Sequence, residues 1–317
     1  MLIIASALAA VIPMSIYLVL IWKFDRYDRE PFKLVLINYL WGALGAIVLA
    51  LIGSMIITII LAIFIKDEVQ LAKFSAVAVA PIVEEITKGF FLLITVANRK
   101  FDNITDGIVY GGAIGLGFGM TENFLYFITY GNNVPSWIML VIIRSLFSAV
   151  MHCVSTATLG AFFGYAKFKP LPKKFVYGFA GLIIAMMIHS IWNFSLSFEK
   201  MAPMGFLFIL ISIIIFIITF SLSLKRERKI IYNELKEEAD NGLIPQLHLE
   251  ILSSPKREKK GWLDERIRKV YIKAATTLAF RKMELKSSSG VSKIYYQNDV
   301  DNYRDFIGRL LSDPQNS

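Results

Sequence analysis

Three ionisable side chains occur within five residues of the apolar segment "PIVEEITKGF", residues 81–90: Glu84, Glu85 and Lys88. On a helix Lys88 can reach either carboxylate, because it follows them by four and three residues, but it cannot serve both well. A carboxylate in a low-dielectric site can take a proton from water and pass it to a leaving amine, which is the chemistry of peptide hydrolysis. Two carboxylates this close resist double ionisation, and Lys88 would keep one of them ionised. The simpler interpretation is an ion pair that holds helices together.

Polar residues also interrupt three later apolar segments. They are Asp106, Glu122 and Asn123 in the first, Arg144 and His152 in the second, and His189 and Asn193 in the third. A charge at the centre of a bilayer costs about 3 kcal/mol, so each should face a partner or a wet cavity. Spacings of four or eight residues form one stripe per helix: Phe118 with Glu122, Arg144 with His152, and His189 with Asn193. The least costly arrangement turns all four stripes toward one site.

Roles can be assigned to these groups on chemical grounds. Either glutamate of the pair could be the general base, and one histidine would assist it. His189 and Asn193 could donate hydrogen bonds to the oxyanion of a tetrahedral intermediate. Asp106 and Arg144 suit supporting positions: Asp106 also fits a helix N-cap, and Arg144 could be the counter-ion of Glu122.

Two alternatives stay open at this point. Glu85, Glu122, His152 and His189 form an acceptable ligand set for zinc, since three ligands and a water are the usual catalytic arrangement. Against zinc, the sequence has no His-Glu dipeptide and so no His-Glu-x-x-His motif. The second alternative is a proton-coupled transporter, because buried carboxylates, lysine and histidine also build proton paths.

The elements that carry these residues are predicted to be membrane helices. Of 317 residues, 56% are hydrophobic and only 19% are charged, with a mean hydropathy of +0.56, whereas soluble chains carry about 25% charged residues. The net charge of +9 is explained by loops of a polytopic protein rather than by nucleic-acid binding. The single cysteine excludes an intrachain disulfide framework.

We expect an all-α polytopic protein with about seven transmembrane helices. The predicted spans are about 2–22, 34–64, 72–97, 106–130, 136–165, 175–197 and 203–224. Odd-numbered connections and the flank after the last span hold fourteen Lys and Arg residues, and even-numbered connections hold three. The positive-inside rule then places the N-terminus outside and the C-terminus in the cytoplasm. The first span lacks a basic start and a cleavage site, so we expect it to be retained.

The segment "DGIVYGGAIGLGFGMTEN", residues 106–123, has glycines four residues apart at 107, 111, 115 and 119. Such a stripe gives a smooth helix face on which a neighbouring helix can pack closely.

Residues 225–317 differ from the rest and are predicted to be a second region. They hold 19 Lys and Arg and 14 Asp and Glu residues, which suits a basic cytoplasmic tail. Residues 263–285 are predicted to form an amphipathic helix lying on the membrane or against another protein. "KSSSGVSK", residues 286–293, is predicted to be a flexible linker.

These motifs together resemble those of the PrsW-type intramembrane proteases, within the wider group of CAAX prenyl proteases and bacteriocin-processing enzymes. The matching residues are Glu84-Glu85, Phe118 with Glu122, His152, and His189 with Asn193, in that order, within about residues 80–195. In the CAAX enzymes the second motif ends in histidine, so Glu122 departs from that branch and agrees with the PrsW branch. The remaining spans match only by hydropathy.

The resemblance implies an intramembrane endopeptidase, residues 1–224, that acts on a membrane-anchored protein substrate. It implies a glutamate- and histidine-activated water rather than a metal, with no cofactor. It further implies site-1 cleavage of an anti-sigma factor in the bacterial cytoplasmic membrane.

Overall fold

The computed structural model describes residues 2–312, which contain helices and no β-strand. They divide into two units, one of residues up to 25 and 30–220, the other of residues 26–29 and from 221 onward. The helices are α1 (Leu2–Phe24), α2 (Phe32–Leu40), η1 (Trp41–Ala46), α3 (Ile47–Leu61), α4 (Glu68–Phe74), η2 (Ser75–Val79), α5 (Ala80–Ala97), α6 (Ile104–Tyr130), α7 (Val134–Ile143), η3 (Arg144–Ser148), α8 (Ala149–Ala166), α9 (Leu171–Ser197), η4 (Glu199–Met201), α10 (Ala202–Asp240), α11 (Gln246–Leu252), η5 (Pro255–Glu258), α12 (Glu265–Ser287) and α13 (Val291–Ser312).

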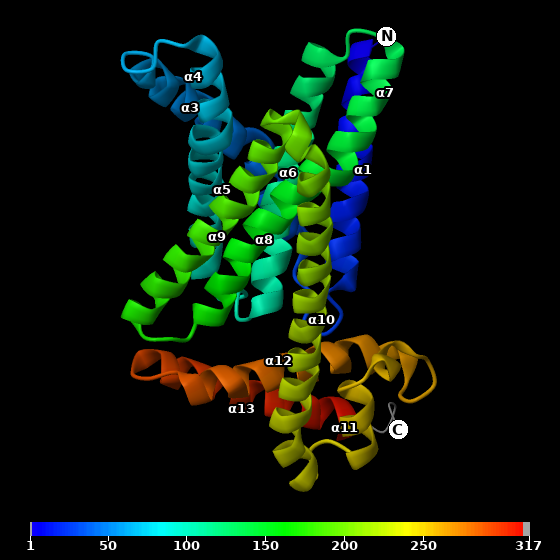
Figure 1. The fold of residues 1–317 in the computed structure, drawn as a ribbon. Helices are drawn as coiled ribbons and strands as arrows, with labels where there is room; N and C mark the ends of the chain where they lie inside the picture. The colour runs from blue at the N-terminus through cyan, green and yellow to red at the C-terminus, as the bar shows by residue number, and fades with distance from the viewer. Residues whose placement is uncertain (1, 313–317) are drawn as a thin grey trace. The chain divides into compact units, whose positions relative to one another are not determined.

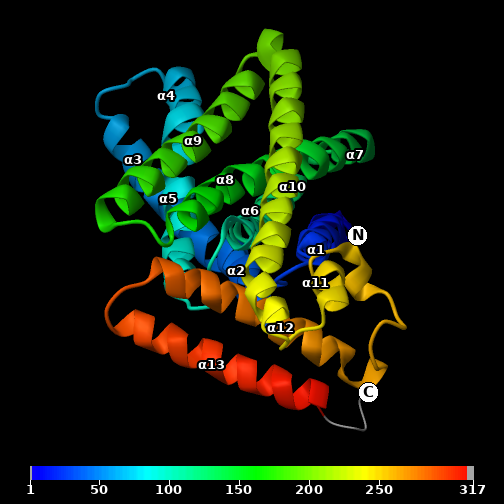
Figure 2. The ribbon, with the colours of Figure 1, turned by 90° about the horizontal axis from the view of Figure 1, so that it is seen from below.

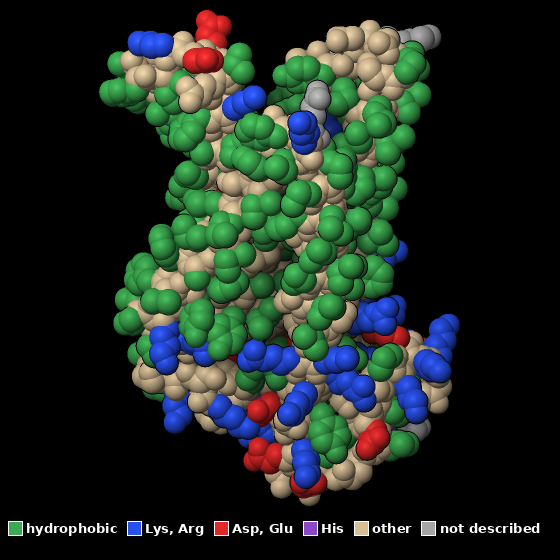
Figure 3. All heavy atoms as spheres, in the orientation of Figure 1, with side chains coloured by type: hydrophobic (Ala, Val, Ile, Leu, Met, Phe, Trp, Pro, Cys, Tyr) green, Lys and Arg blue, Asp and Glu red, His purple; other side chains and the backbone are tan. Residues whose placement is uncertain are grey.

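The first unit has the helices of a polytopic membrane protein, which confirms the predicted fold class. By length and composition, five helical stretches could cross a membrane: Leu2–Phe24, Phe32–Leu61, Val134–Ala166, Leu171–Ser197 and Ala202–Asp240. The other two predicted spans correspond to η2 with α5, and to α6, which carry buried charged residues and the glycines. Hydrophobic side chains cover the middle of this unit on the face shown in Figure 3. The number of spans and their orientation stay predictions.

Helix α6 is the central helix of the membrane unit, with α1, α2 and α8 packed around it (Figures 1 and 2). Every residue from Thr105 to Gly119 is buried. A Cβ atom on Gly107 would collide with the backbone of Gly160 in α8, and one on Gly115 would collide with the His152 carbonyl. The predicted glycine stripe therefore allows α8 to approach α6 closely, and this contact fixes the position of His152.

Three short π-helical segments interrupt the membrane helices. They are η1, η2 and η3; η2 leads directly into α5, and η3 leads into α8 and begins with Arg144. A π-turn changes the direction in which the side chains before and after it point, and such turns occur often at functional sites. Here two of the three come immediately before the helices that carry Glu84 and His152.

The second unit has its own hydrophobic core, formed by the end of α10 with α11, α12 and α13. The predicted helix over 263–285 is confirmed as α12. The flexible linker predicted over 286–293 is wrong: α12 continues to Ser287, α13 begins at Val291, and the turn between them uses Gly290 with φ of +60°. Tyr27, from the loop after α1, lies in this core and accepts a hydrogen bond from Arg257 at its carbonyl, 3.0 Å.

Candidate active site

Four helices bring the predicted ionisable side chains together inside the membrane unit. They are Glu84, Glu85 and Lys88 from α5, Glu122 from α6, His152 from α8 and His189 from α9. The two imidazole rings lie edge to face with their centroids 4.7 Å apart. The structure thus brings residues of all four polar stripes together at one site, as the spacing predicts.

Glu85 is fully buried, and all its contacts within the site are hydrogen bonds that it accepts. Its Oε1 atom accepts from Lys88 Nζ at 2.7 Å, from Ser155 Oγ at 3.1 Å and from His189 Nδ1 at 3.1 Å. Its Oε2 atom accepts from Thr156 Oγ1 at 3.2 Å. A carboxylate that accepts this many hydrogen bonds is held in one position, and both oxygens of Glu85 are already occupied by these donors.

Glu84 differs sharply from its neighbour. Its Oε2 atom is buried and makes no hydrogen bond with any described residue. This atom lies 3.6 Å from Lys88 Nζ, 3.8 Å from His189 Nε2 and 3.9 Å from His152 Nδ1. An unsatisfied buried carboxylate oxygen is costly unless it binds a water, a ligand or an ion. Glu84 is therefore the group of the pair that is available for chemistry.

Glu122 is paired, as predicted, with Arg144. Its Oε2 atom accepts from Arg144 Nη2 at 2.6 Å and from His152 Nε2 at 2.7 Å. Arg144 also donates through Nε to Asn123 Oδ1 at 3.1 Å, and its guanidinium lies 3.6 Å from the centroid of the Tyr126 ring. This network fixes His152 from the side opposite Lys88.

The hydrogen-bond partners assign a tautomer to His152. Lys88 Nζ donates to His152 Nδ1 at 3.0 Å, so that nitrogen carries no proton and Nε2–H donates to Glu122. His189 donates through Nδ1–H to Glu85, and its Nε2 atom lies 3.8 Å from Glu84 Oε2. Each histidine therefore presents one nitrogen to the centre of the site.

Two predicted residues lie away from this centre. Asn193 donates through Nδ2 to the Ala76 carbonyl at 2.9 Å and so ties α9 to η2. Asp106 is neither the N-cap nor a supporting residue of the site: Asn103 is the N-cap of α6, and Asp106 closes its capping box as the third residue. It lies sixteen residues before Glu122 on α6, about 24 Å along the helix axis.

Ser155 and Thr156 are site residues that the sequence reasoning missed, although a signal was present. Both hydrogen-bond to Glu85 and are fully buried. They follow His152 by three and four residues, which is one turn along the same helix face. Phe118, which was predicted, lies beneath the site, with Lys88 Nζ 4.2 Å from its ring centroid and the His152 ring 5.2 Å away.

Among the described residues, one group has the composition and spacing of a metal site: Glu84, His152 and His189, with ligand atoms all within 4.8 Å of one another. This corrects the predicted set, since Glu85 is committed to four hydrogen bonds and Glu122 to Arg144. Two imidazoles and a carboxylate suit zinc. The arrangement does not fit an ion, however, because Lys88 already donates to the lone pair of His152 that would bind it.

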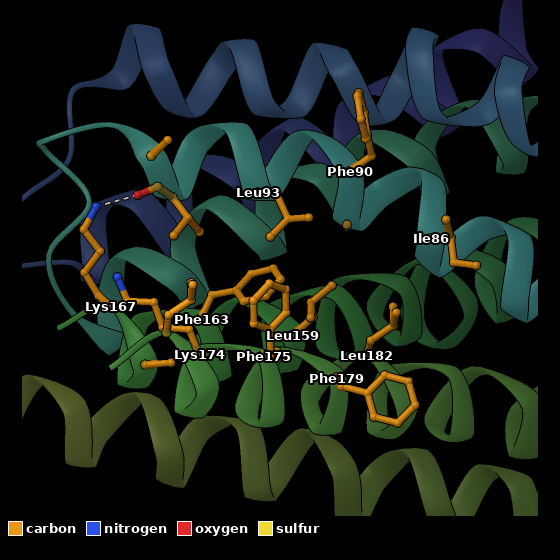
Figure 4. Close-up of a pocket in the computed structure, with 16 residues that line it drawn as sticks. Ile86, Phe90, Leu93, Leu159, Phe163, Lys167, Lys174, Phe175, Phe179 and Leu182 are labelled. Atoms are coloured by element: carbon orange, nitrogen blue, oxygen red, sulfur yellow. Dashed lines mark hydrogen bonds between the residues drawn. The ribbon is translucent and has the colours of Figure 1, made fainter. Parts of the chain in front are cut away.

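An apolar cavity of about 610 Å³ lies between α5, α8 and α9, with Lys167 and Lys174 at one end and Ile86 at the other (Figure 4). It follows the helix faces that carry the site. Leu159 comes seven residues after His152, Leu182 comes seven before His189, and seven residues are two helical turns. The cavity therefore lies about two helical turns from the site along α8 and α9.

Comparison with known proteins shows the family of the chain. Residues 30–221 match the model of the PrsW family of intramembrane metalloproteases. The chain is 30% identical to Protease PrsW of Geobacillus kaustophilus over 54% of this chain and 71% of the relative. It is 27% identical to Protease PrsW of Clostridioides difficile over 61% of this chain and 79% of the relative. It is 29% identical to Protease PrsW of Bacillus subtilis over 55% of this chain and 74% of the relative. No solved structure is significantly similar. The chain belongs to the PrsW family of intramembrane proteases.

Proposed function

We propose that this chain hydrolyses a peptide bond in a membrane-anchored protein with a water molecule that Glu84 activates. The observation that carries the proposal is the Glu84 Oε2 atom, which is buried, makes no hydrogen bond with the described residues and lies 3.8 Å from the Nε2 atom of His189. A water molecule can lie within hydrogen-bond distance of both atoms, donating one hydrogen to each.

In the proposed reaction Glu84 acts first as base and then as acid. It takes a proton from the water as the water oxygen forms a bond to the carbonyl carbon of the substrate. The tetrahedral intermediate collapses when Glu84 gives that proton to the amide nitrogen and the carbon–nitrogen bond breaks. A positioned general acid–base group of this kind contributes about 10²–10⁴-fold to a rate.

The other charged groups support this cycle by holding its geometry. Glu85 fixes His189 through its Nδ1–H, so that Nε2 can orient the water. Glu122 accepts a hydrogen bond from His152 and so fixes the imidazole ring. The Arg144 guanidinium neutralises the negative charge of Glu122. His189 donates through Nδ1–H to Glu85, and Asn193 lies away from the centre of the site with its amide on the Ala76 carbonyl, so we assign neither to the oxyanion.

For the substrate class, the PrsW resemblance implies an anti-sigma factor in the bacterial cytoplasmic membrane, and we extend that to this chain. Single-span anti-sigma factors are the first substrates to test. Family membership also supports hydrolysis over the alternative of proton-coupled transport.

The test is cleavage of candidate single-span proteins by the purified full-length chain in proteoliposomes. We expect the wild type to cleave and a Glu84→Ala/Glu85→Ala variant to be inactive, with a chelator having no effect on the wild type. Glu68→Ala, an exposed change on α4, is the matched control. Loss of wild-type activity on chelation, with recovery on adding zinc, would contradict the metal-free form of the proposal.

We further propose that the apolar cavity receives the apolar segment of the substrate, since it lies two turns from the site along the same helices. Leu182→Trp would narrow the cavity, and we expect it to raise KM for a membrane-anchored substrate about tenfold with little change in kcat. Ile183→Trp is the matched control, because the adjacent Ile183 does not line the cavity. Equal kinetics for the two variants would show that the substrate does not use this cavity.

A further inference from the structure

The ammonium group of Lys88 lies close to the place that a metal ion bound by Glu84 and His152 would occupy. Of the three candidate ligand atoms, His152 Nδ1 is 3.0 Å from Lys88 Nζ and Glu84 Oε2 is 3.6 Å from it. The Lys88 side chain is fully buried, so it is part of the packed site and not a mobile surface group. We propose that Lys88 is the resident cation of this centre and keeps metal ions out of it.

The first argument is the direction of one lone pair. An imidazole nitrogen has a single lone pair in the ring plane, and His152 Nδ1 uses it to accept from Lys88. A zinc ion would lie on the same line at about 2.0–2.1 Å from the nitrogen. Zinc and the ammonium nitrogen would then be on the order of 1 Å apart, so His152 can serve only one of them.

The second argument is that the surroundings of Lys88 hold it in place. Glu85 accepts from Lys88 Nζ at 2.7 Å, and the Phe118 ring presents its face to the ammonium at 4.2 Å. Two of the three N–H groups are therefore committed to Glu85 and His152, and Glu84 Oε2 is the next polar atom. The positive charge adjoins the place proposed for the attacking water.

The third argument is that removing Lys88 leaves a complete ligand set. Glu84 Oε2, His152 Nδ1 and His189 Nε2 would then all be free to bind an ion, and a water would complete four-coordination. Lysine at position 88 thus separates a metal-free site from a zinc site built of the same ligands.

The experiment measures bound metal in the full-length chain, purified in detergent without chelators, incubated with zinc and then desalted. We expect fewer than about 0.1 zinc per wild-type chain and about one zinc per chain in Glu85→Gln/Lys88→Ala. The double change removes the lysine without leaving Glu85 as an unpaired buried charge. Cobalt should give the visible absorption of a tetrahedral site in this variant alone.

Two controls complete the design. Glu85→Gln keeps Lys88 and should bind no zinc, and adding His189→Ala to the double variant should abolish its zinc binding. Size-exclusion profiles and zinc-dependent thermal unfolding show whether each variant is folded.

About one tightly bound zinc in the wild type overturns the proposal, whatever the variants do. A folded double variant that binds no zinc overturns the claim that Lys88 is what excludes it. The inference builds on the proposed metal-free function, but its readout is bound metal and not cleavage. Its failure would therefore leave the protease assignment standing, and an inactive wild type would not affect it.

Discussion

Replacing Glu84 with glutamine is expected to slow substrate cleavage about 10³-fold, which lies within the contribution of a positioned general base. Glutamine has the size and shape of glutamate but cannot accept a proton from water. Because Glu84 Oε2 makes no hydrogen bond with a described residue, the change removes no hydrogen bond of that atom and only its 3.6 Å ion pair with Lys88, which keeps its shorter contact with Glu85, so the unfolding temperature should stay close to that of the wild type. The measurement is kcat on a reconstituted single-span substrate, with thermal unfolding followed in parallel.

Glu68→Gln on the exposed surface of α4 is the matched control and should leave both quantities unchanged. The assignment of the base would fail if Glu84→Gln kept more than about a tenth of the wild-type kcat. The unfolding measurement shows whether a loss of activity comes from the missing carboxylate or from a variant that no longer folds.

The convergence of four helices could be predicted from the sequence because it depends on two simple rules. Ionisable groups are excluded from lipid, and residues four or eight apart share a helix face. The glycine stripe could be predicted for the same kind of reason, since glycines 107–119 at four-residue spacing leave one face of α6 flat. These rules can be applied to each helix separately, without knowing how the helices pack against one another.

The separate roles of Glu84 and Glu85 could not be predicted in this way. Adjacent residues point about 100° apart on a helix, and which of them is saturated with donors depends on the helix that packs there. Here α8 presents Ser155 and Thr156 to Glu85 and leaves Glu84 open. Whether the site can bind a metal ion could not be predicted for the same reason. Only the position of Lys88 relative to His152 shows that the lysine and a metal ion would compete for one lone pair.

Local composition was misleading in two further places. Serines and a glycine suggested a flexible linker, yet most of that segment continues α12 and α13, and only a short turn at Gly290 remains. Asp106 suited an N-cap by residue type, but Asn103, three residues earlier, takes that place. The joining of residues 26–29 to the second unit depends on a contact between Tyr27 and Arg257, 230 residues apart, which no local pattern contains.

The buried pair of Lys88 and Glu85 is expected to be the most sensitive point for stability. Lys88→Met keeps the volume of the side chain but leaves Glu85 as an uncompensated buried charge, which costs about 3–5 kcal/mol of unfolding free energy. Glu85→Gln leaves Lys88 with His152 and the Phe118 ring and should cost less. The measurement is unfolding of the full-length chain in detergent, with Lys66→Met at an exposed position as the control.

The double variant Glu85→Gln/Lys88→Met decides whether the pair itself is responsible. It leaves no unpaired charge at position 85, and the glutamine amide oxygen can still accept hydrogen bonds from Ser155 and Thr156. It should therefore be more stable than Lys88→Met alone, with a coupling free energy between the two sites of about 1–3 kcal/mol. Additive losses would mean that each residue stabilises the helices through separate contacts. The charge of Lys88 would then be present for the chemistry at Glu84 and not for holding α5 against α8.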